Sequence, residues 1–302
     1  MLLLYVLWNV VLPIFLVAGM GALLHRTVRL DPQPLSRAVF YVFSPALAFT
    51  GLYTLHMDQK GLFKAIALAG MIALFMLAAG LLIARLGHYS RVHTSATLLT
   101  LLNSNTGNYG LPLNQFAFGP TGLQFAILFF VMNALLANSV GVYIASTGRA
   151  DPLQALKNVL KTPLVYATLL ALLANWQGWN VPAPVYKALH LSGQAAVPVL
   201  LVILGIQLSR LGGKIHWRDV LPVTGLKLIV GPILAWFLSG YLGMSGTFRA
   251  VAIVQSSMPT AVMSTVLSTE FDCEPEYVAE VVFVTTAVSV VTLTVLLSLL
   301  IG

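Results

Sequence analysis

Two short segments combine polar side chains with helix-interrupting residues inside otherwise apolar sequence. Leu102 to Asn114 reads LNSNTGNYGLPLN, and Gln255 to Thr260 reads QSSMPT. Amide and hydroxyl groups can bind a carboxylate without the free-energy cost of burying a charged side chain. The residues of the two segments that could make such hydrogen bonds are Asn105, Asn108, Asn114, Gln255, Ser257 and Thr260.

Each of the two segments lies in an apolar run that would otherwise form a membrane-spanning helix. Glycine and proline in the segments predict that both of these helices are broken near mid-membrane depth. Proline removes a backbone donor and clashes with the preceding turn, and glycine lets the chain leave helical angles. The residues concerned are Gly107, Gly110, Pro112 and Pro259. Two half-helix N-termini that meet there, each with free N–H groups and partial positive charge, would form an anion site. The alternative is that the polar groups only join helices to one another.

Lys227 and Asn133 are further polar residues within apolar runs. A lysine at membrane depth costs at least about 2.5 kcal/mol on insertion scales, so it needs compensation. Lys227 could assist an anionic substrate or act as a fixed cation; alternatively it reaches the membrane surface or pairs with Asp219. Asn133 could face the same site. The 9 acidic residues lie at or near the ends of apolar runs, so no proton or cation site built on buried carboxylates is visible.

Composition identifies an integral membrane protein. Of 302 residues, 58% are hydrophobic and 8% are charged, whereas roughly a quarter of the residues of a soluble domain are charged. The net charge of +7 comes from basic residues scattered between apolar runs, which is typical of membrane topology and not of nucleic-acid binding. A single cysteine excludes an intrachain disulfide or a cysteine metal cluster, and the histidines lack zinc-binding spacing. We expect no cofactor and no enzymatic activity.

Ten apolar runs are long enough to span a bilayer, which takes about 20 residues each. We therefore predict an all-α membrane protein with ten transmembrane helices, of which the fourth and ninth are broken. The runs are Leu2 to Leu24, Leu35 to Leu55, Leu62 to Leu86, Thr94 to Phe118, Leu123 to Ser146, Val159 to Trp179, Val185 to Leu208, Val220 to Gly243, Phe248 to Leu267 and Val278 to Ile301.

Basic residues predict the orientation of the chain. Most lie in the odd-numbered connections: Arg26, Arg29, Arg37, Arg85, Arg91, Arg149, Lys157, Lys161, Arg210, Lys214 and Arg218. Even-numbered connections carry fewer: Lys60, Lys64, Lys187 and Arg249. Because cytoplasmic loops are enriched in Lys and Arg, we expect both termini to lie outside the cytoplasm of a cell-membrane protein. The acidic stretch from Glu270 to Glu280 is expected to be a solvated cytoplasmic loop.

Matched prolines indicate an internal repeat. Pro13 and Pro163, Pro45 and Pro198, and Pro112 and Pro259 are each separated by roughly 150 residues. Five helices per copy is an odd number, so the second copy must be inverted relative to the first, as in many secondary transporters. We predict a first five-helix repeat over residues 1–147, a cytoplasmic connection over 148–161 and a second, inverted repeat over 162–302.

At these residues the chain resembles the auxin efflux carrier family, in its compact prokaryotic form. The similarity is carried by NTGNYGLP from Asn105 to Pro112, KTPLVYA from Lys161 to Ala167 and QSSMPTA from Gln255 to Ala261. The long cytoplasmic loop that typical plant members carry after the fifth helix is not present in this sequence.

The resemblance implies a fold and a mechanism. Helices one, two, six and seven would form a dimerising scaffold, so a homodimer is expected, and helices three to five and eight to ten would form a transport domain that moves as an elevator. Asn105 corresponds to a substrate-binding asparagine, Asn133 to a glutamine of plant members, and Pro112 and Pro259 to the prolines where the broken helices cross. The implied substrate is a small organic anion. Three points stay open: the identity of that anion, the direction of transport, and whether Na⁺ or H⁺ is coupled.

Two other functions remain open from the sequence. The first is a sodium-coupled organic-anion symporter resembling the bile-acid symporters, which share the general architecture. The second is a membrane receptor that binds the ligand at the broken helices without transporting it. Sodium dependence of uptake would identify the symporter, and binding without flux would identify the receptor.

Overall fold

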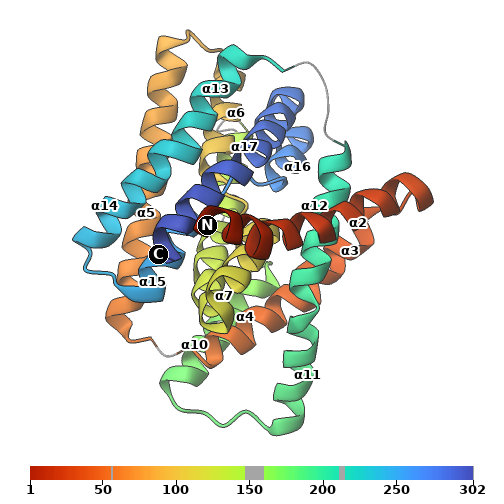
Figure 1. Cartoon of the computed structure of the whole chain (residues 1–302), viewed down its shortest axis with the longest axis vertical. Helices are drawn as coiled ribbons and strands as arrows, with labels where there is room; N and C mark the ends of the chain where they lie inside the picture. Colours follow the sequence, from red (N-terminus) through yellow and green to blue (C-terminus); the bar gives the residue numbers. More distant parts are fainter. Residues whose placement is uncertain (56, 147–159, 211–214, 302) are drawn as a thin grey trace.

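The computed structural model describes residues 1–55, 57–146, 160–210 and 215–301, and the regular elements in these ranges are helices (Figure 1). The α-helices are α1 (Leu2–Val6), α2 (Leu12–Val28), α3 (Pro32–Ala38), α4 (Ser44–Tyr53), α5 (Gln59–Leu86), α6 (Arg91–Leu102), α7 (Leu111–Leu136), α8 (Val142–Ala145), α10 (Pro163–Trp176), α11 (Ala183–Gln194), α12 (Ala196–Arg210), α13 (Trp217–Gly225), α14 (Gly231–Tyr241), α15 (Gly246–Ser256), α16 (Met263–Glu270) and α17 (Pro275–Ile301). Turns of π-helix, η1 (Leu7–Val11), η2 (Val39–Phe43), η3 (Thr106–Gly110), η4 (Ala137–Gly141) and η5 (Leu226–Val230), lie between some of them.

In the described ranges, 7 helical stretches are long and apolar enough to cross a membrane. They are Leu2–Val28, Pro32–Tyr53, Gln59–Leu86, Thr106–Ala145, Ala183–Arg210, Trp217–Tyr241 and Pro275–Ile301, and Pro163–Trp176 is a shorter apolar helix. These eight helices correspond to nine of the ten predicted runs, because the second half of the fourth run and the fifth run are joined in one stretch. The ninth run is divided into two shorter helices, α15 and α16. The connection predicted over 148–161 lies mostly outside the described residues.

The fourth and ninth runs are interrupted, but the first break is displaced from its predicted position. Helix α6 ends at Leu102 and η3 starts at Thr106, so the chain leaves helical geometry at 103–105. Pro112 lies after the break, in a continuous helical stretch in which the π-helical turn η3 leads directly into α7. Pro259 does lie in an interruption, between α15 and α16.

Proline explains four of the π-helical turns. A proline ring clashes with the carbonyl four residues earlier and cannot donate to it, so a wider turn relieves the conflict. The helices after η1, η2, η3 and η5 each have proline as their second residue, namely Pro13, Pro45, Pro112 and Pro232. The prolines of the predicted repeat therefore widen helices more often than they break them.

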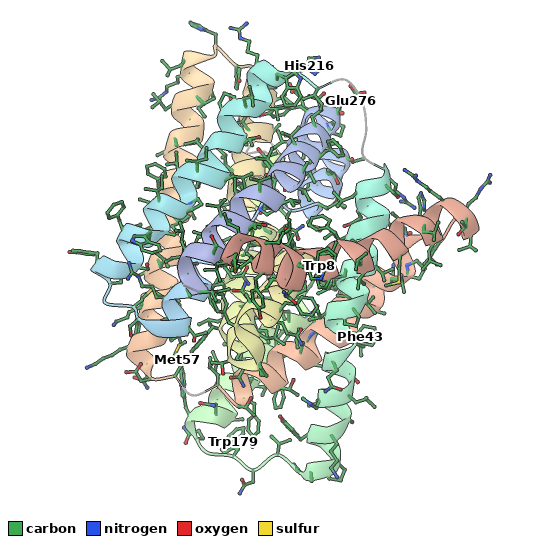
Figure 2. The ribbon with its side chains drawn as sticks, viewed as in Figure 1. Trp8, Phe43, Met57, Trp179, His216 and Glu276 are labelled. Carbon is green, nitrogen blue, oxygen red and sulfur yellow. The ribbon has the colours of Figure 1, made fainter. Side chains whose placement is uncertain are left out.

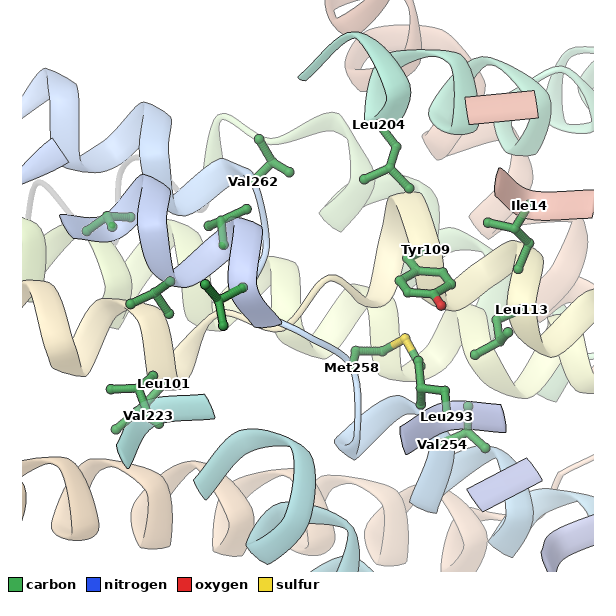
Figure 3. Packing of buried hydrophobic residues seen from close by; sticks show 14 of the residues in the cluster. Ile14, Leu101, Tyr109, Leu113, Leu204, Val223, Val254, Met258, Val262 and Leu293 are labelled. Atoms are coloured by element: carbon green, nitrogen blue, oxygen red, sulfur yellow. The ribbon is translucent and has the colours of Figure 1, made fainter. Parts of the chain in front are cut away.

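One of two large clusters of buried apolar side chains lies where α2, η3, α12, α15 and α17 meet. Figure 3 shows Tyr109 of η3 with Ile14 of α2, Leu204 of α12 and Leu113 of α7 around it. The phenol ring of Tyr109 also meets Phe15 edge-on, with ring centroids 5.7 Å apart. Tyr109 thus attaches the interrupted helix to the packed pair α2 and α12.

Several connections lie near the two ends of the molecule's long axis. Figure 2 shows His216 and Glu276 at one end and Met57 and Trp179 at the other. The first two belong to connections predicted on one side of the membrane, and the last two to connections predicted on the opposite side. A chain that crosses a layer repeatedly has this arrangement.

Candidate functional site

The two interruptions pair with each other through their backbones. The amide N–H of Asn105 donates to the carbonyl of Pro259 (2.8 Å), and the amide of Ala261 donates to the carbonyl of Asn103 (3.0 Å). Ser104 and Thr260 thereby form an isolated antiparallel bridge. Buried backbone groups need such partners, so each interruption satisfies the other. Four half-helices meet near this bridge: α6 and α15 end before it, and η3 (which continues into α7) and α16 begin after it.

Lys227, on η5, has its side chain next to the bridge, where it contacts the C-terminal end of α6. Its side chain is 1% exposed, and its Nζ donates to the carbonyls of Thr100 (3.1 Å), Leu101 (2.8 Å) and Asn103 (3.1 Å). Three acceptors match the three N–H donors of an ammonium group. The alternative of a pair with Asp219 is wrong, because Asp219 accepts instead from the Tyr89 hydroxyl (2.8 Å).

The ammonium position has an electrostatic consequence. The last carbonyls of a helix lack intrahelical donors and carry partial negative charge. In many transporters such half-helix C-termini coordinate Na⁺ or H⁺. Here a side-chain cation already occupies that position at α6.

A cavity of about 60 Å³ adjoins the bridge and brings together three predicted site residues, Asn133, Lys227 and Gln255. A water molecule needs roughly 10–15 Å³, so the cavity has room for a few waters and not for a whole organic anion. Its lining comes from α5, α6, η3, α7, η5, α15 and the adjoining bridge segment. A substrate can enter only if these elements separate.

Asn133 uses its amide group on the backbone of the bridge. Its Oδ1 accepts from the Ser104 N–H (3.2 Å), and its Nδ2 donates to the Ser104 carbonyl (2.9 Å). The side chain therefore pairs with the backbone of Ser104 as a neighbouring β-strand would, and it stabilises the interrupted segment in an extended geometry.

Gln255 joins the same region from α15. It is 2% exposed, and its Nε2 donates to the carbonyls of Ala126 (3.1 Å) and Thr106 (3.4 Å). In the part of the chain that is described, its Oε1 has no hydrogen-bond partner. Gly110 permits this approach, because a Cβ there would lie 2.3 Å from Oε1. Gly107 similarly leaves room for Phe130, 2.9 Å from a Cβ placed on it.

Asn105 occupies the N-cap position of η3, immediately before the second half of the broken helix. The side chain is 4% exposed, and within the described ranges its Nδ2 has no hydrogen-bond partner. A buried donor without a partner costs roughly 1–3 kcal/mol. It lies beside backbone N–H groups that also precede the first intrahelical bonds. This end of the helix therefore offers donors to an acceptor that would come from outside the chain.

The remaining predicted residues have hydrogen-bond partners within the protein. Ser257 donates to the Ile253 carbonyl (2.6 Å) and Thr260 to the Thr100 carbonyl (3.0 Å). Asn114 donates to the Gly110 carbonyl (2.8 Å), and Asn108 donates to Gln207 on α12 (3.4 Å). Their hydroxyl and amide donors are thus used inside the protein, and these four side chains do not line the cavity.

Sequence reasoning did not single out several residues of this region. Asn103 lies in the asparagine-rich segment and is buried, and Thr106 lines the cavity. Gln207 could have been noticed as a polar residue within an apolar run. The acidic stretch is also more ordered than expected, because Glu274 pairs with His93, and Glu280 accepts from the His216 backbone and ring (2.8 and 2.9 Å).

Known proteins share much of this sequence. A sequence model described as "Membrane transport protein" matches residues 6–155 and 152–297. An "Uncharacterized transporter" from Methanothermobacter thermautotrophicus is 27% identical over 268 residues, which cover 87% of this chain and 87% of the relative. A Rhizobium meliloti protein provisionally named a malonate transporter is 24% identical over 207 residues, covering 65% of this chain and 64% of the relative. Auxin efflux carrier component 8 of Arabidopsis thaliana is 25% identical over 135 residues, covering 42% of this chain and 36% of the relative.

Proposed function

Because this chain belongs to the membrane transport protein family, which includes auxin efflux carriers, we propose that it is a secondary transporter of small organic anions. The substrate class is a mono- or dicarboxylate, such as a malonate-like or auxin-like acid. The names of two relatives, a malonate transporter and an auxin carrier, are compatible with this class.

One observation carries the proposal: the unpartnered, buried amide of Asn105 at the start of η3. A carboxylate placed there would accept from the Asn105 Nδ2 and from backbone N–H groups at the positive end of the helix. Neutral donors can bind an anion without a buried cation at the contact. Asn108, in the same turn, is the next donor within reach of the segment.

Lys227 supports an anion over a cation at the broken helix. The negative end of α6 is already neutralised by the ammonium, which lies within 3.1 Å of three carbonyls. The positive end at η3 has no comparable side-chain cap. This polarity favours an anionic substrate and leaves no need for sodium at α6, which argues against the sodium-coupled symporter.

The proposed mechanism is an elevator. Spans one, two, six and seven form the scaffold and the dimer contact, and spans three to five and eight to ten carry the substrate, with the two interruptions as a crossover of inverted repeats. Both termini lie outside the cytoplasm of the cell membrane in this arrangement.

The test begins with binding. The purified protein is heated with malonate, acetate, indole-3-acetate or a bile acid, with and without sodium, since a ligand at about 100 times its Kd adds nearly 3 kcal/mol of apparent stability. We expect a carboxylate to raise the melting temperature equally with and without sodium. Stabilisation that requires sodium would indicate the symporter instead. An unchanged melting temperature with all of these ligands would contradict the substrate class.

Variants of Asn105 localise the site. Asn105→Ala should lower the affinity at least several-fold, and Asn105→Asp should abolish binding by repelling the anion, while aspartate keeps a favourable N-cap for the helix. Asn9→Ala is the matched control, because Asn9 is exposed and bonds to Tyr5 within its own helix. Wild-type affinity in Asn105→Asp would refute the site. Uptake into proteoliposomes then separates a transporter from a receptor that only binds.

A further inference from the structure

Asn108 and Gln207 link the interrupted helix to a helix of the predicted scaffold. Asn108 belongs to η3 and Gln207 to α12, and the Asn108 Nδ2 donates to the Gln207 Oε1 at 3.4 Å. Both side chains are half-buried. The distance is long for a hydrogen bond between neutral groups, so the contact is one that a better acceptor can replace.

The packing around this pair fixes where Gln207 points. Leu204 is fully buried in the cluster that includes Tyr109, the residue after Asn108 (Figure 3). Residues three apart on a helix share a face, so Gln207 extends the Leu204 face of α12 toward η3. The apolar contact holds the two helices together, and the polar pair forms at its edge.

Building on the proposed function, we propose that Gln207 is a positioning residue that occupies the place of a substrate carboxylate in the empty carrier. Its amide oxygen accepts from Asn108 when no anion is present. A carboxylate is a stronger acceptor than an amide, because hydrogen bonds to ionised groups are about twice as strong. The anion therefore takes the Asn108 donor, and the same exchange removes the polar link and loosens η3 from α12.

This exchange couples substrate binding to movement of the transport domain. The empty carrier keeps one hydrogen bond between η3 and the scaffold, and the loaded carrier exchanges it for a bond to the cargo. No charged group has to leave a partner in this exchange, so the barrier it adds is small: a neutral hydrogen bond contributes about 1 kcal/mol net.

A second hydrogen bond between the proposed transport domain and the proposed scaffold supplies a control. The Gln124 Nε2 on α7 donates to the Oγ1 of Thr54, the residue after α4, at 2.8 Å. Gln124 is about four helical turns along the chain from Asn108. Breaking this link weakens the attachment to the scaffold without freeing the Asn108 amide.

The experiment compares Gln207→Met, Gln207→Glu and Gln124→Met in the full chain. Calorimetry with malonate and acetate measures affinity, and amide hydrogen exchange over 106–110 measures whether η3 is released. We expect Gln207→Met to bind about three- to tenfold more tightly, the equivalent of one neutral hydrogen bond. Gln207→Glu should bind at least tenfold more weakly through charge repulsion, and Gln124→Met should bind like wild type.

The exchange data separate this proposal from the transport function. In the protein without ligand, Gln207→Met should speed exchange over 106–110, and Gln124→Met should not. Unchanged exchange in Gln207→Met, equal affinity gains in both methionine variants, or no effect of either carboxylate on wild-type exchange would each overturn the role of Gln207. Normal binding with no flux in liposomes would instead overturn only the transport function.

Discussion

The Nζ of Lys227 lies 2.8 Å from the carbonyl oxygen of Leu101, at the last turn of α6. The same ammonium also binds the carbonyls of Thr100 and Asn103. A lysine buried in a membrane protein is costly unless it is compensated. Here the compensation comes from backbone carbonyls that lack donors within α6 because the helix ends there, so the charge and the broken helix stabilise each other.

Replacing this lysine should therefore damage the broken helix itself. Lys227→Met removes the charged donor from all three carbonyls, although those of Thr100 and Asn103 keep the Thr260 hydroxyl and the Ala261 N–H. We expect the unfolding free energy to fall by about 3 kcal/mol or more, since hydrogen bonds to charged groups contribute roughly 1.5–3 kcal/mol each. Thermal unfolding in detergent measures this loss. Transport per folded molecule should be lost as well, because the positions of Asn105 and Asn108 depend on the same segment.

A matched lysine provides the control for this prediction. The Lys64 Nζ donates to one carbonyl, that of Gly243 (2.8 Å), at an exposed position. Lys64→Met should change the melting temperature little. We also expect sodium to stabilise Lys227→Met and not the wild type, because the vacated carbonyls can then coordinate a cation. Equal melting temperatures for the two methionine variants would show that the carbonyl contacts contribute nothing.

Asn133 yields a second prediction, because its side-chain amide hydrogen-bonds to both the N–H and the carbonyl of Ser104. Asn133→Leu leaves the Ser104 N–H unpaired, whereas the Ser104 carbonyl keeps the Thr106 N–H (2.8 Å). Thermal unfolding should show a loss of roughly 1–3 kcal/mol, the cost of one unpaired buried group. Asn138→Leu is the control, since Asn138 is half-buried on the same helical stretch and bonds only to the Ala134 carbonyl of the preceding turn. A similar loss in both variants would mean that burial, and not the Ser104 contact, determines the effect.

The sequence predicts the interruptions better than the partners of the polar groups around them. Clustered Asn, Gly and Pro indicate broken helices because each residue type acts on the local backbone. The choice of Lys227's partner depends instead on which helix end packs against η5, a tertiary fact that spacing along the chain does not contain. Asp219 is the acid closest to Lys227 in sequence, yet the acceptors come from α6, more than a hundred residues earlier.

Gln207 illustrates the same limit in the opposite direction. Its polar side chain is visible in the apolar run, but the role proposed for it depends on contact with Asn108, which lies 99 residues earlier in the chain. The sequence also places the break at Pro112, whereas the chain leaves helical geometry at 103–105 and Pro112 lies in the helical stretch that follows. At the break Ser104 pairs with Thr260, a long-range contact that spacing along the chain does not contain.

Close packing of α2 against α12 gives the third prediction. A Cβ added at Gly205 would lie 1.7 Å from the Ala18 carbonyl oxygen, and one at Gly21 would lie 2.2 Å from that of Val202. Small residues at such contacts let membrane helices approach closely. Gly205→Ala must therefore push the two backbones apart, and we expect a loss of about 3 kcal/mol or more, above the usual range for overpacking because the contact is with backbone. The same displacement should move Gln207 away from Asn108 and speed amide exchange over 106–110.

Gly19→Ala is the control, because Gly19 lies on the exposed side of α2 and a Cβ there meets nothing within 4 Å. It should leave both the melting temperature and the exchange rates unchanged, and a Gly205→Ala protein as stable as Gly19→Ala would show that the two helices can separate without cost.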